Sequence, residues 1–233
     1  PYISQKPTNA VVATSWILFQ DARASEMNTV VLQIICLAIF FVALWLASKG
    51  ITMLKRISAL AGTTMFIMSI LYIVLMVAAP AITDASLLKI DWSVETFMPT
   101  FDMKFFTGLS ILVFAVGGCE KFSPYVNKMK DPSKDFSKGM ISLAVMVCAC
   151  AILGTISLGM MFDSNNIPED LMTNGAYYAF QMLGEYYGLG NLFVILYAIT
   201  QLLGQISVMI ISIDAPLCML LGSADENYIP KAL

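Results

Sequence analysis

Long stretches without charged residues are the feature that most constrains the fold of this chain. Four such stretches occur, at residues 27–48, 57–88, 139–162 and 186–213. Three of them carry no charged side chain at all, and the second carries only Asp84, close to its end. An α-helix needs about 20 apolar residues to cross the hydrocarbon core of a bilayer. Each stretch therefore predicts a membrane-spanning helix.

The composition supports a membrane protein and excludes several classes of function. Hydrophobic residues make up 58% of the 233 positions and charged residues 12%, whereas a soluble domain carries about 25% charged residues. The chain has no histidine, which removes most zinc, haem and Ser-His-Asp chemistry. Its net charge of −3 offers no basic surface for phosphates. We therefore expect no metal, no cofactor and no nucleic-acid partner.

The spans and their connections suggest one all-α, polytopic membrane helix bundle over residues 1–233. The predicted spans are 1–20 (partial), 28–48, 57–82, 105–127 (broken at 117–120), 139–162 and 187–213. Residues 169–184 are expected to form a helix at the outer membrane surface. Because the chain begins at Pro1 and its first span looks incomplete, we expect it to be a piece of a longer protein, or a trimmed form of one.

Charge alternates between successive connections, and this predicts the orientation. Residues 49–56 carry three basic residues and no acid, and residues 120–138 carry five lysines. Acidic residues outnumber basic ones at 84–104 and at 163–185. Lysine and arginine in short loops favour the cytoplasmic side. We therefore predict a multi-pass protein of the cell membrane, with 49–56, 120–138 and the tail at 214–233 in the cytoplasm.

The span at 105–127 is irregular in a way that indicates a binding site. Gly117 and Gly118 each weaken a helix by about 1 kcal/mol relative to alanine. Glu120 would cost about 3 kcal/mol if it were charged at the centre of the bilayer. A short, glycine-interrupted, acid-bearing span is typical of a discontinuous helix, whose free backbone groups can bind a zwitterion or a cation. The interruption is expected near residues 115–121.

A simpler interpretation of this segment stays open. Residues 105–119 could form a short tilted span that ends at the cytoplasmic surface, with the two glycines at its C-terminal cap and Glu120 in water. The length of this stretch, 15 residues, argues against that interpretation because it is short for a span.

Two glutamines give the last span a polar face. Gln201 and Gln205 are four residues apart and therefore share one face of a helix, to which Ser212 returns two turns later. Val208 interrupts this face, so it is not continuously polar. Such residues serve either helix packing or a substrate pathway.

The stretch Gly117–Glu120, followed by Asn127 and by residues 130–136, resembles the sixth transmembrane helix and following loop of APC-superfamily amino-acid transporters. Residues 214–231 resemble the end of the eighth helix and its loop. The nearest branch looks like the bacterial glutamate/GABA antiporter family. By this resemblance the chain is a fragment, helices three to eight, of a twelve-helix, inverted-repeat, LeuT-like transporter with a broken helix.

The resemblance implies that Gly117, Gly118 and Cys119 line the substrate site, and that Glu120 acts in gating or proton coupling. With the rest of the broken segment and the glutamine face, the candidate substrate-binding residues are Ala115, Val116, Gly117, Gly118, Cys119, Gln201 and Gln205. Polar uncharged residues, Gln201, Gln205 and Ser207, stand in the helix where the glutamate antiporter carries a carboxylate.

These observations predict a secondary active transporter, an antiporter or proton-coupled, that moves amino acids or related small zwitterions by alternating access. No ATP-binding GxxxxGK[ST] motif occurs. A non-transporting helical membrane protein, such as a receptor or assembly subunit, is the alternative. A membrane enzyme fits less well, since only Glu120 offers acid–base chemistry within a span. The expected partners are an amino-acid substrate and the lipid bilayer, and a homodimer is compatible with this assignment.

Overall fold

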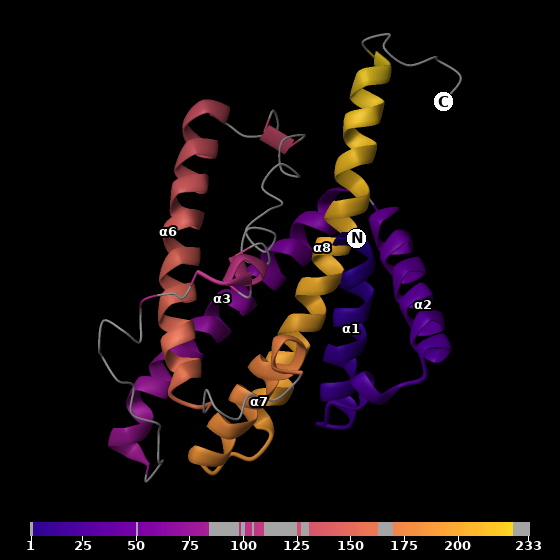
Figure 1. The fold of residues 1–233 in the computed structure, drawn as a ribbon. Helices are drawn as coiled ribbons and strands as arrows, with labels where there is room; N and C mark the ends of the chain where they lie inside the picture. Colours follow the sequence, from indigo (N-terminus) through magenta and orange to yellow (C-terminus); the bar gives the residue numbers. More distant parts are fainter. Residues whose placement is uncertain are drawn as a thin grey trace. The chain divides into compact units, whose positions relative to one another are not determined.

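The computed structural model describes residues 2–49, 51–83, 98, 101–103, 105–109, 125–126, 131–162 and 170–225. Within these ranges the long elements are α-helices, and no strand occurs among them (Figure 1). They are α1 (Tyr2–Leu18), the 3-10 helix η1 (Arg23–Glu26), α2 (Thr29–Ala47), α3 (Ile51–Ile82), α6 (Pro132–Gly159), α7 (Leu171–Tyr186) and α8 (Leu192–Asp225). The predicted all-α class is confirmed.

The chain divides into two compact units. The first unit comprises Pro1–Leu88 and Met146–Asp214, and the second comprises Lys89–Val145 and Ala215–Leu233. Helices α1, α2, α3 and α7 belong to the first unit, as do the C-terminal part of α6 and most of α8. The site described below lies entirely within the first unit.

Four helices are long and apolar enough to cross a membrane. These segments are Thr29–Ala47, Lys55–Ile82, Pro132–Gly159 and Leu192–Leu220. Large apolar side chains such as Ile34 and Phe41 on α2, or Val145 on α6, are more than half exposed. Apolar surface of this kind suits a hydrocarbon surrounding. The helices occupy the four charge-free stretches of the sequence, and they show that the chain is a polytopic membrane protein.

Local capping explains where α2 begins and ends. The Asn28 side chain accepts a hydrogen bond of 2.9 Å from the Val30 N–H, which satisfies a free donor of the first turn. At the other end, the Ser48 hydroxyl donates to the Trp45 carbonyl at 2.7 Å. The Lys49 ammonium lies 4.6 Å from the centre of the Trp45 ring. A tryptophan and a lysine together at a helix end are typical of the membrane interface.

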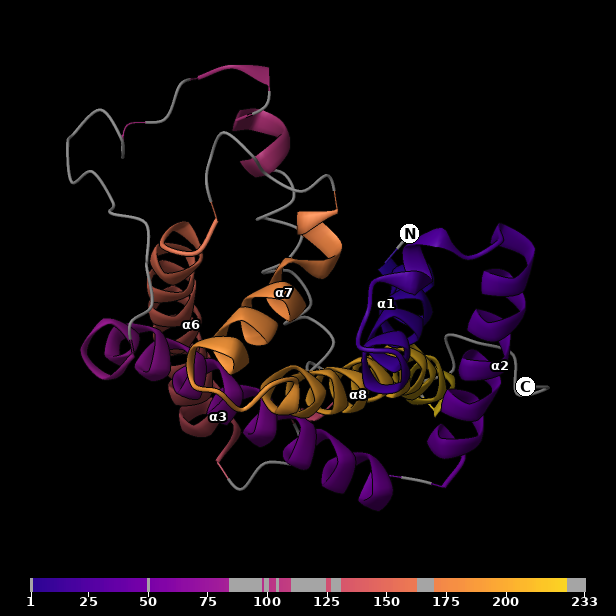
Figure 2. The same cartoon turned by 90° about the horizontal axis from the view of Figure 1, so that it is seen from below.

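The core of the first unit lies where α1, α3, α7 and α8 meet. Trp16 of α1, Met76 of α3, Leu183 of α7 and Val194 of α8 are each at most 1% exposed and belong to one apolar cluster. Figure 2 shows α1 against α8, with α2 on the far side of α1. Ala13 of α1 is also fully buried, as expected for a small residue between packed membrane helices.

Two close contacts join α3 to α8. The Ser207 hydroxyl of α8 donates to the Ser58 hydroxyl of α3 at 2.9 Å. A Cβ atom placed on Gly204 would lie 2.5 Å from the sulfur of Met65, so the missing side chain leaves room for α3 beside α8. Serine and glycine here serve the packing of helices, as expected for small residues in membrane spans.

Candidate functional site

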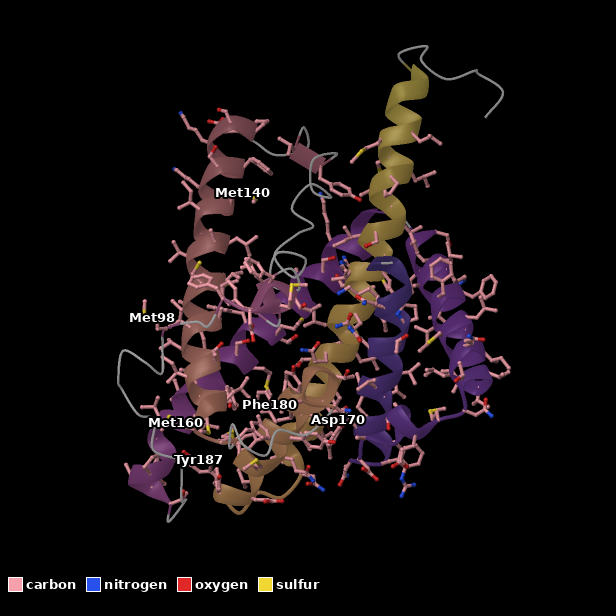
Figure 3. All side chains as sticks on the ribbon, in the orientation of Figure 1. Met98, Met140, Met160, Asp170, Phe180 and Tyr187 are labelled. Carbon is pink, nitrogen blue, oxygen red and sulfur yellow. The ribbon has the colours of Figure 1, made fainter. Side chains whose placement is uncertain are left out.

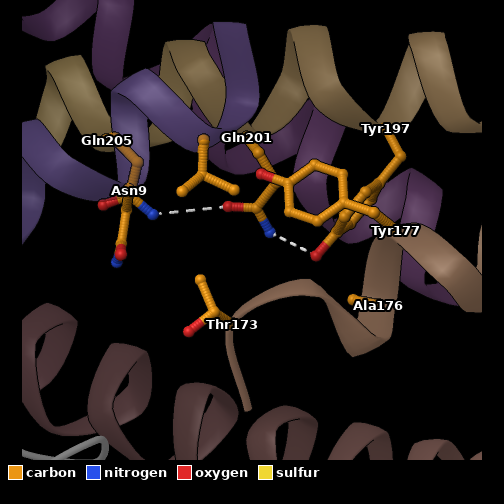
Figure 4. Close-up of a pocket in the computed structure, with 8 residues that line it drawn as sticks. Asn9, Thr173, Ala176, Tyr177, Tyr197, Gln201 and Gln205 are labelled. Atoms are coloured by element: carbon orange, nitrogen blue, oxygen red, sulfur yellow. Dashed lines mark hydrogen bonds between the residues drawn. The ribbon is translucent and has the colours of Figure 1, made fainter. Parts of the chain in front are cut away.

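A cavity of about 280 Å³ lies between α1, α7 and α8 (Figure 4). One water molecule needs about 10–15 Å³ of such volume, so the cavity has room for a small solute and is not limited to a single water molecule. Eight residues line the cavity: Asn9 and Val12 from α1, Thr173, Ala176 and Tyr177 from α7, and Tyr197, Gln201 and Gln205 from α8.

The wall formed by α8 is a chain of hydrogen bonds along one helix face. Tyr197, Gln201 and Gln205 follow at four-residue intervals, which places their side chains one above another. The Gln201 amide Nε2 donates to the Tyr197 hydroxyl at 2.6 Å. The Gln205 Nε2 donates to Gln201 Oε1 at the longer distance of 3.4 Å. Both donors point along the helix toward Tyr197, as the dashed lines of Figure 4 show.

Gln205 Oε1 ends this chain without a partner. The atom is buried and accepts no hydrogen bond from the described part of the protein. A buried acceptor left unpaired costs about 1–3 kcal/mol relative to a paired one. The cavity therefore contains a position where a donor from a bound molecule would be stabilised.

Aromatic rings fix the tyrosines of the cavity. The Tyr197 ring meets Tyr177 edge-on at 5.1 Å and stacks on Phe180 at 4.4 Å. Trp16 stacks in turn on Tyr177 at 5.3 Å with nearly parallel planes. Burial raises the pKa of the Tyr177 phenol above its ordinary value, with a smaller contribution from Tyr197, so this hydroxyl stays neutral.

A buried hydrogen-bond network attaches α7 to α1. The Trp16 Nε1–H donates to Asn174 Oδ1 at 2.8 Å, and Asn174 is 0% exposed. Asp170 accepts from the Asn174 amide at 2.9 Å and from the Tyr178 hydroxyl at 2.7 Å, both on Oδ2. Figure 3 labels Asp170 and Phe180 among the side chains around α7. The network places Thr173, the neighbour of Asn174, at the cavity.

The same environment keeps Tyr178 protonated. Burial, followed by the hydrogen bond to Asp170, raises the pKa of Tyr178 to about 12. Its hydroxyl therefore keeps its proton, and can donate it in a hydrogen bond, over the whole physiological range of pH.

The cavity lining is polar but uncharged. Its eight residues offer amides, hydroxyls and aromatic rings, and none of these eight side chains carries a formal charge. They contain no nucleophile paired with a base, so this lining provides no catalytic arrangement. Such a surface offers hydrogen-bond donors and acceptors to a small polar solute.

The structure brings together two of the residues predicted from the sequence. Gln201 and Gln205 both line the cavity. The other predicted residues, Ala115, Val116, Gly117, Gly118, Cys119 and Glu120, lie outside the described residues, as does the expected break in that helix. Their roles stay predictions. Ser212, expected on the glutamine face, donates to the Val208 carbonyl of its own helix at 2.7 Å.

Sequence reasoning missed the remaining polar residues of the cavity. Tyr197 could have been found, because it extends the spacing of Gln201 and Gln205 by one more turn. Asn9 and Thr173 carry no comparable signal. They come from α1 and α7, and only the tertiary packing brings them to α8.

Similarity to known proteins identifies the family of the chain. Residues 2–217 match the amino acid permease family. The chain is 49% identical over 236 residues to the aspartate/glutamate permease AcaP of Lactococcus lactis subsp. cremoris (strain MG1363), covering 100% of this chain and 48% of AcaP. The chain thus spans about half the length of that curated relative, and no solved structure matches it. Apolar helices and sequence similarity together place the chain in the amino acid permease family, as the resemblance at Gly117–Glu120 predicted.

Proposed function

We propose that the protein is a secondary active transporter of amino acids and that aspartate and glutamate are its first candidate substrates. The similarity to the aspartate/glutamate permease AcaP carries this proposal. Membership of the amino acid permease family and four apolar helices of spanning length support it. Transport proceeds by alternating access, with exchange or proton coupling as the source of energy.

The substrate site combines two parts in this proposal. The first is the glutamine face of α8, and it is supported by the position of Gln201 and Gln205 in a cavity of suitable size. The second part is the backbone of residues 115–119, with Glu120 as gate or proton carrier.

The orientation forms part of the same proposal. The connection 49–56, the segment 120–138 and the tail at 214–233 face the cytoplasm. Lys49, Lys55 and Arg56 are exposed, and none forms an ion pair with a described carboxylate. Uncompensated basic charge at the junction of α2 and α3 supports a cytoplasmic position.

Uptake into proteoliposomes tests the proposal. The full-length gene product is reconstituted, and radiolabelled aspartate uptake is measured against a panel of unlabelled amino acids. Acceleration by internal glutamate would identify exchange, and acceleration by an inward proton gradient would identify proton coupling. Binding of amino acids without any uptake would favour the receptor alternative and refute the transporter.

A further inference from the structure

The hydrogen-bond chain on α8 has a direction, and its free end is an acceptor. Gln201 donates to Tyr197, and Gln205 donates to Gln201, so both amide dipoles are oriented the same way. Hydrogen bonds in a row polarise one another in surroundings of low dielectric constant. The negative end of this hydrogen-bond chain is Gln205 Oε1, which is buried and unpaired within the described residues.

The lining of the cavity provides no cation for this oxygen. Asn9 and Thr173 line the same cavity, but neither forms a hydrogen bond with Gln205 Oε1. Lys6 lies about one turn before Asn9 on α1 and is not among the lining residues. The described residues supply no donor to this oxygen, which leaves it open to a donor from a bound molecule.

The surroundings of Gln205 favour a cationic donor over an anionic group. A carboxylate only accepts hydrogen bonds, so it gains nothing from an amide oxygen. An ammonium group donates up to three hydrogen bonds and is also attracted to the faces of tyrosine rings. Tyr177 and Tyr197 line the cavity together with Gln205.

We propose that Gln205 Oε1 accepts a hydrogen bond from the ammonium group of the amino-acid substrate. The carboxylates of the substrate then bind away from the hydrogen-bond chain on α8. The identity of the ligand rests on the proposed function. The position of the ammonium group rests on the geometry of the cavity. Gln205 thus selects for amino acids against dicarboxylic acids of the same length.

Glutamate and glutarate form the matched pair of probes, because glutarate has both carboxylates and lacks the ammonium group. Binding of radiolabelled glutamate to the purified full-length protein is measured, with glutarate as competitor. The variants are Gln205→Leu, which removes the acceptor, and Gln205→Glu, which keeps an acceptor of similar size. Gln33→Leu is the control, since Gln33 is an exposed glutamine on α2 away from the cavity lining.

Gln205→Leu should weaken glutamate binding by about tenfold or more, the usual effect of losing a hydrogen bond to a charged group, and should leave glutarate binding unchanged. Gln205→Glu should retain glutamate binding and weaken glutarate binding, because it adds a negative charge. Gln33→Leu should behave as the wild type. If the Gln205→Leu variant does not fold, the comparison of Gln205→Glu with the wild type still tests the inference.

Three results would overturn the inference. Equal weakening of both ligands by Gln205→Leu would show that Gln205 only shapes the cavity. Glutamate selectivity retained in Gln205→Leu, or lost from Gln205→Glu, would place the ammonium group elsewhere. Gln205-dependent binding without uptake would refute the transporter and leave the inference standing.

Discussion

Replacing Gly184 with alanine should destabilise the protein, because the turn between α7 and α8 leaves no room for a methyl group. Gly184 lies in the last turn of α7, and its carbonyl accepts the Leu189 N–H at 2.9 Å. The chain then turns through Gly188 and Gly190, whose φ angles are +66° and +55°. A Cβ on Gly184 would overlap the carbonyl oxygen of Gly190.

The size of the effect follows from the nature of the contact. The Gly190 oxygen is a backbone atom, so it cannot rotate away as the end of a side chain would. Relief requires a shift of the whole turn, and such overpacking costs about 1–3 kcal/mol. For a chain of this length, 1 kcal/mol corresponds to a change in Tm of roughly 2–4 °C. Gly184→Ala should therefore lower Tm by several degrees.

Thermal unfolding of the purified protein in detergent measures this difference. Gly154→Ala in α6 is the matched control, because a Cβ there meets no atom within 4 Å. Alanine is favoured over glycine inside a helix by about 1 kcal/mol, so the control should keep or raise Tm. Identical Tm values for the two variants would refute the close contact between α7 and the turn.

Three further changes test the remaining parts of the site. Trp16→Phe keeps a ring but removes the hydrogen bond from Trp16 to Asn174, and unfolding in detergent should show a loss of about 1 kcal/mol. An unchanged Tm would contradict the network. If Gly118 lines the substrate site as proposed, Gly118→Leu should abolish aspartate uptake while the protein still inserts into the membrane, because the new side chain would fill that space. Normal uptake would favour the short tilted span. Glu120→Gln should flatten the pH dependence of uptake between about pH 5 and 8, because an amide does not take up or release a proton in this range. A pH profile identical to that of the wild type would remove Glu120 from the mechanism.

The sequence predicts the helices well because the membrane imposes a local rule. Each uncharged stretch of about 20 residues must satisfy its backbone internally, and in water-free surroundings a helix does this. The helix ends follow a different rule. Helix α3 begins at Ile51 and α6 at Pro132, in both cases before the charge-free stretch. Charged residues are compatible with a helix in water, so charge marks the edge of the membrane and not the end of the helix.

The candidate site was predictable only in part. Spacing alone places Gln201 and Gln205 on one face, because a helix has a fixed period. The opposite walls depend on which helices pack together. Trp16 and Asn174 are 158 positions apart in the chain, and no local sequence pattern predicts their contact. The unpaired oxygen of Gln205 depends further on the rotamers of Gln205 and Gln201, which the sequence does not determine.

The two tryptophans of the described residues occupy opposite environments, and this makes them separate fluorescent reporters. Trp16 is 1% exposed and stacks on Tyr177, which lines the cavity. Trp45 is 60% exposed and lies beneath Lys49 at the end of α2. A ligand that displaces Tyr177 changes the emission of Trp16, whereas quenchers attached to lipid head groups reach Trp45. Once the third tryptophan of the sequence, Trp92, is replaced by phenylalanine, the emission of this chain, resolved by quenching, separates events in the cavity from events at the membrane surface.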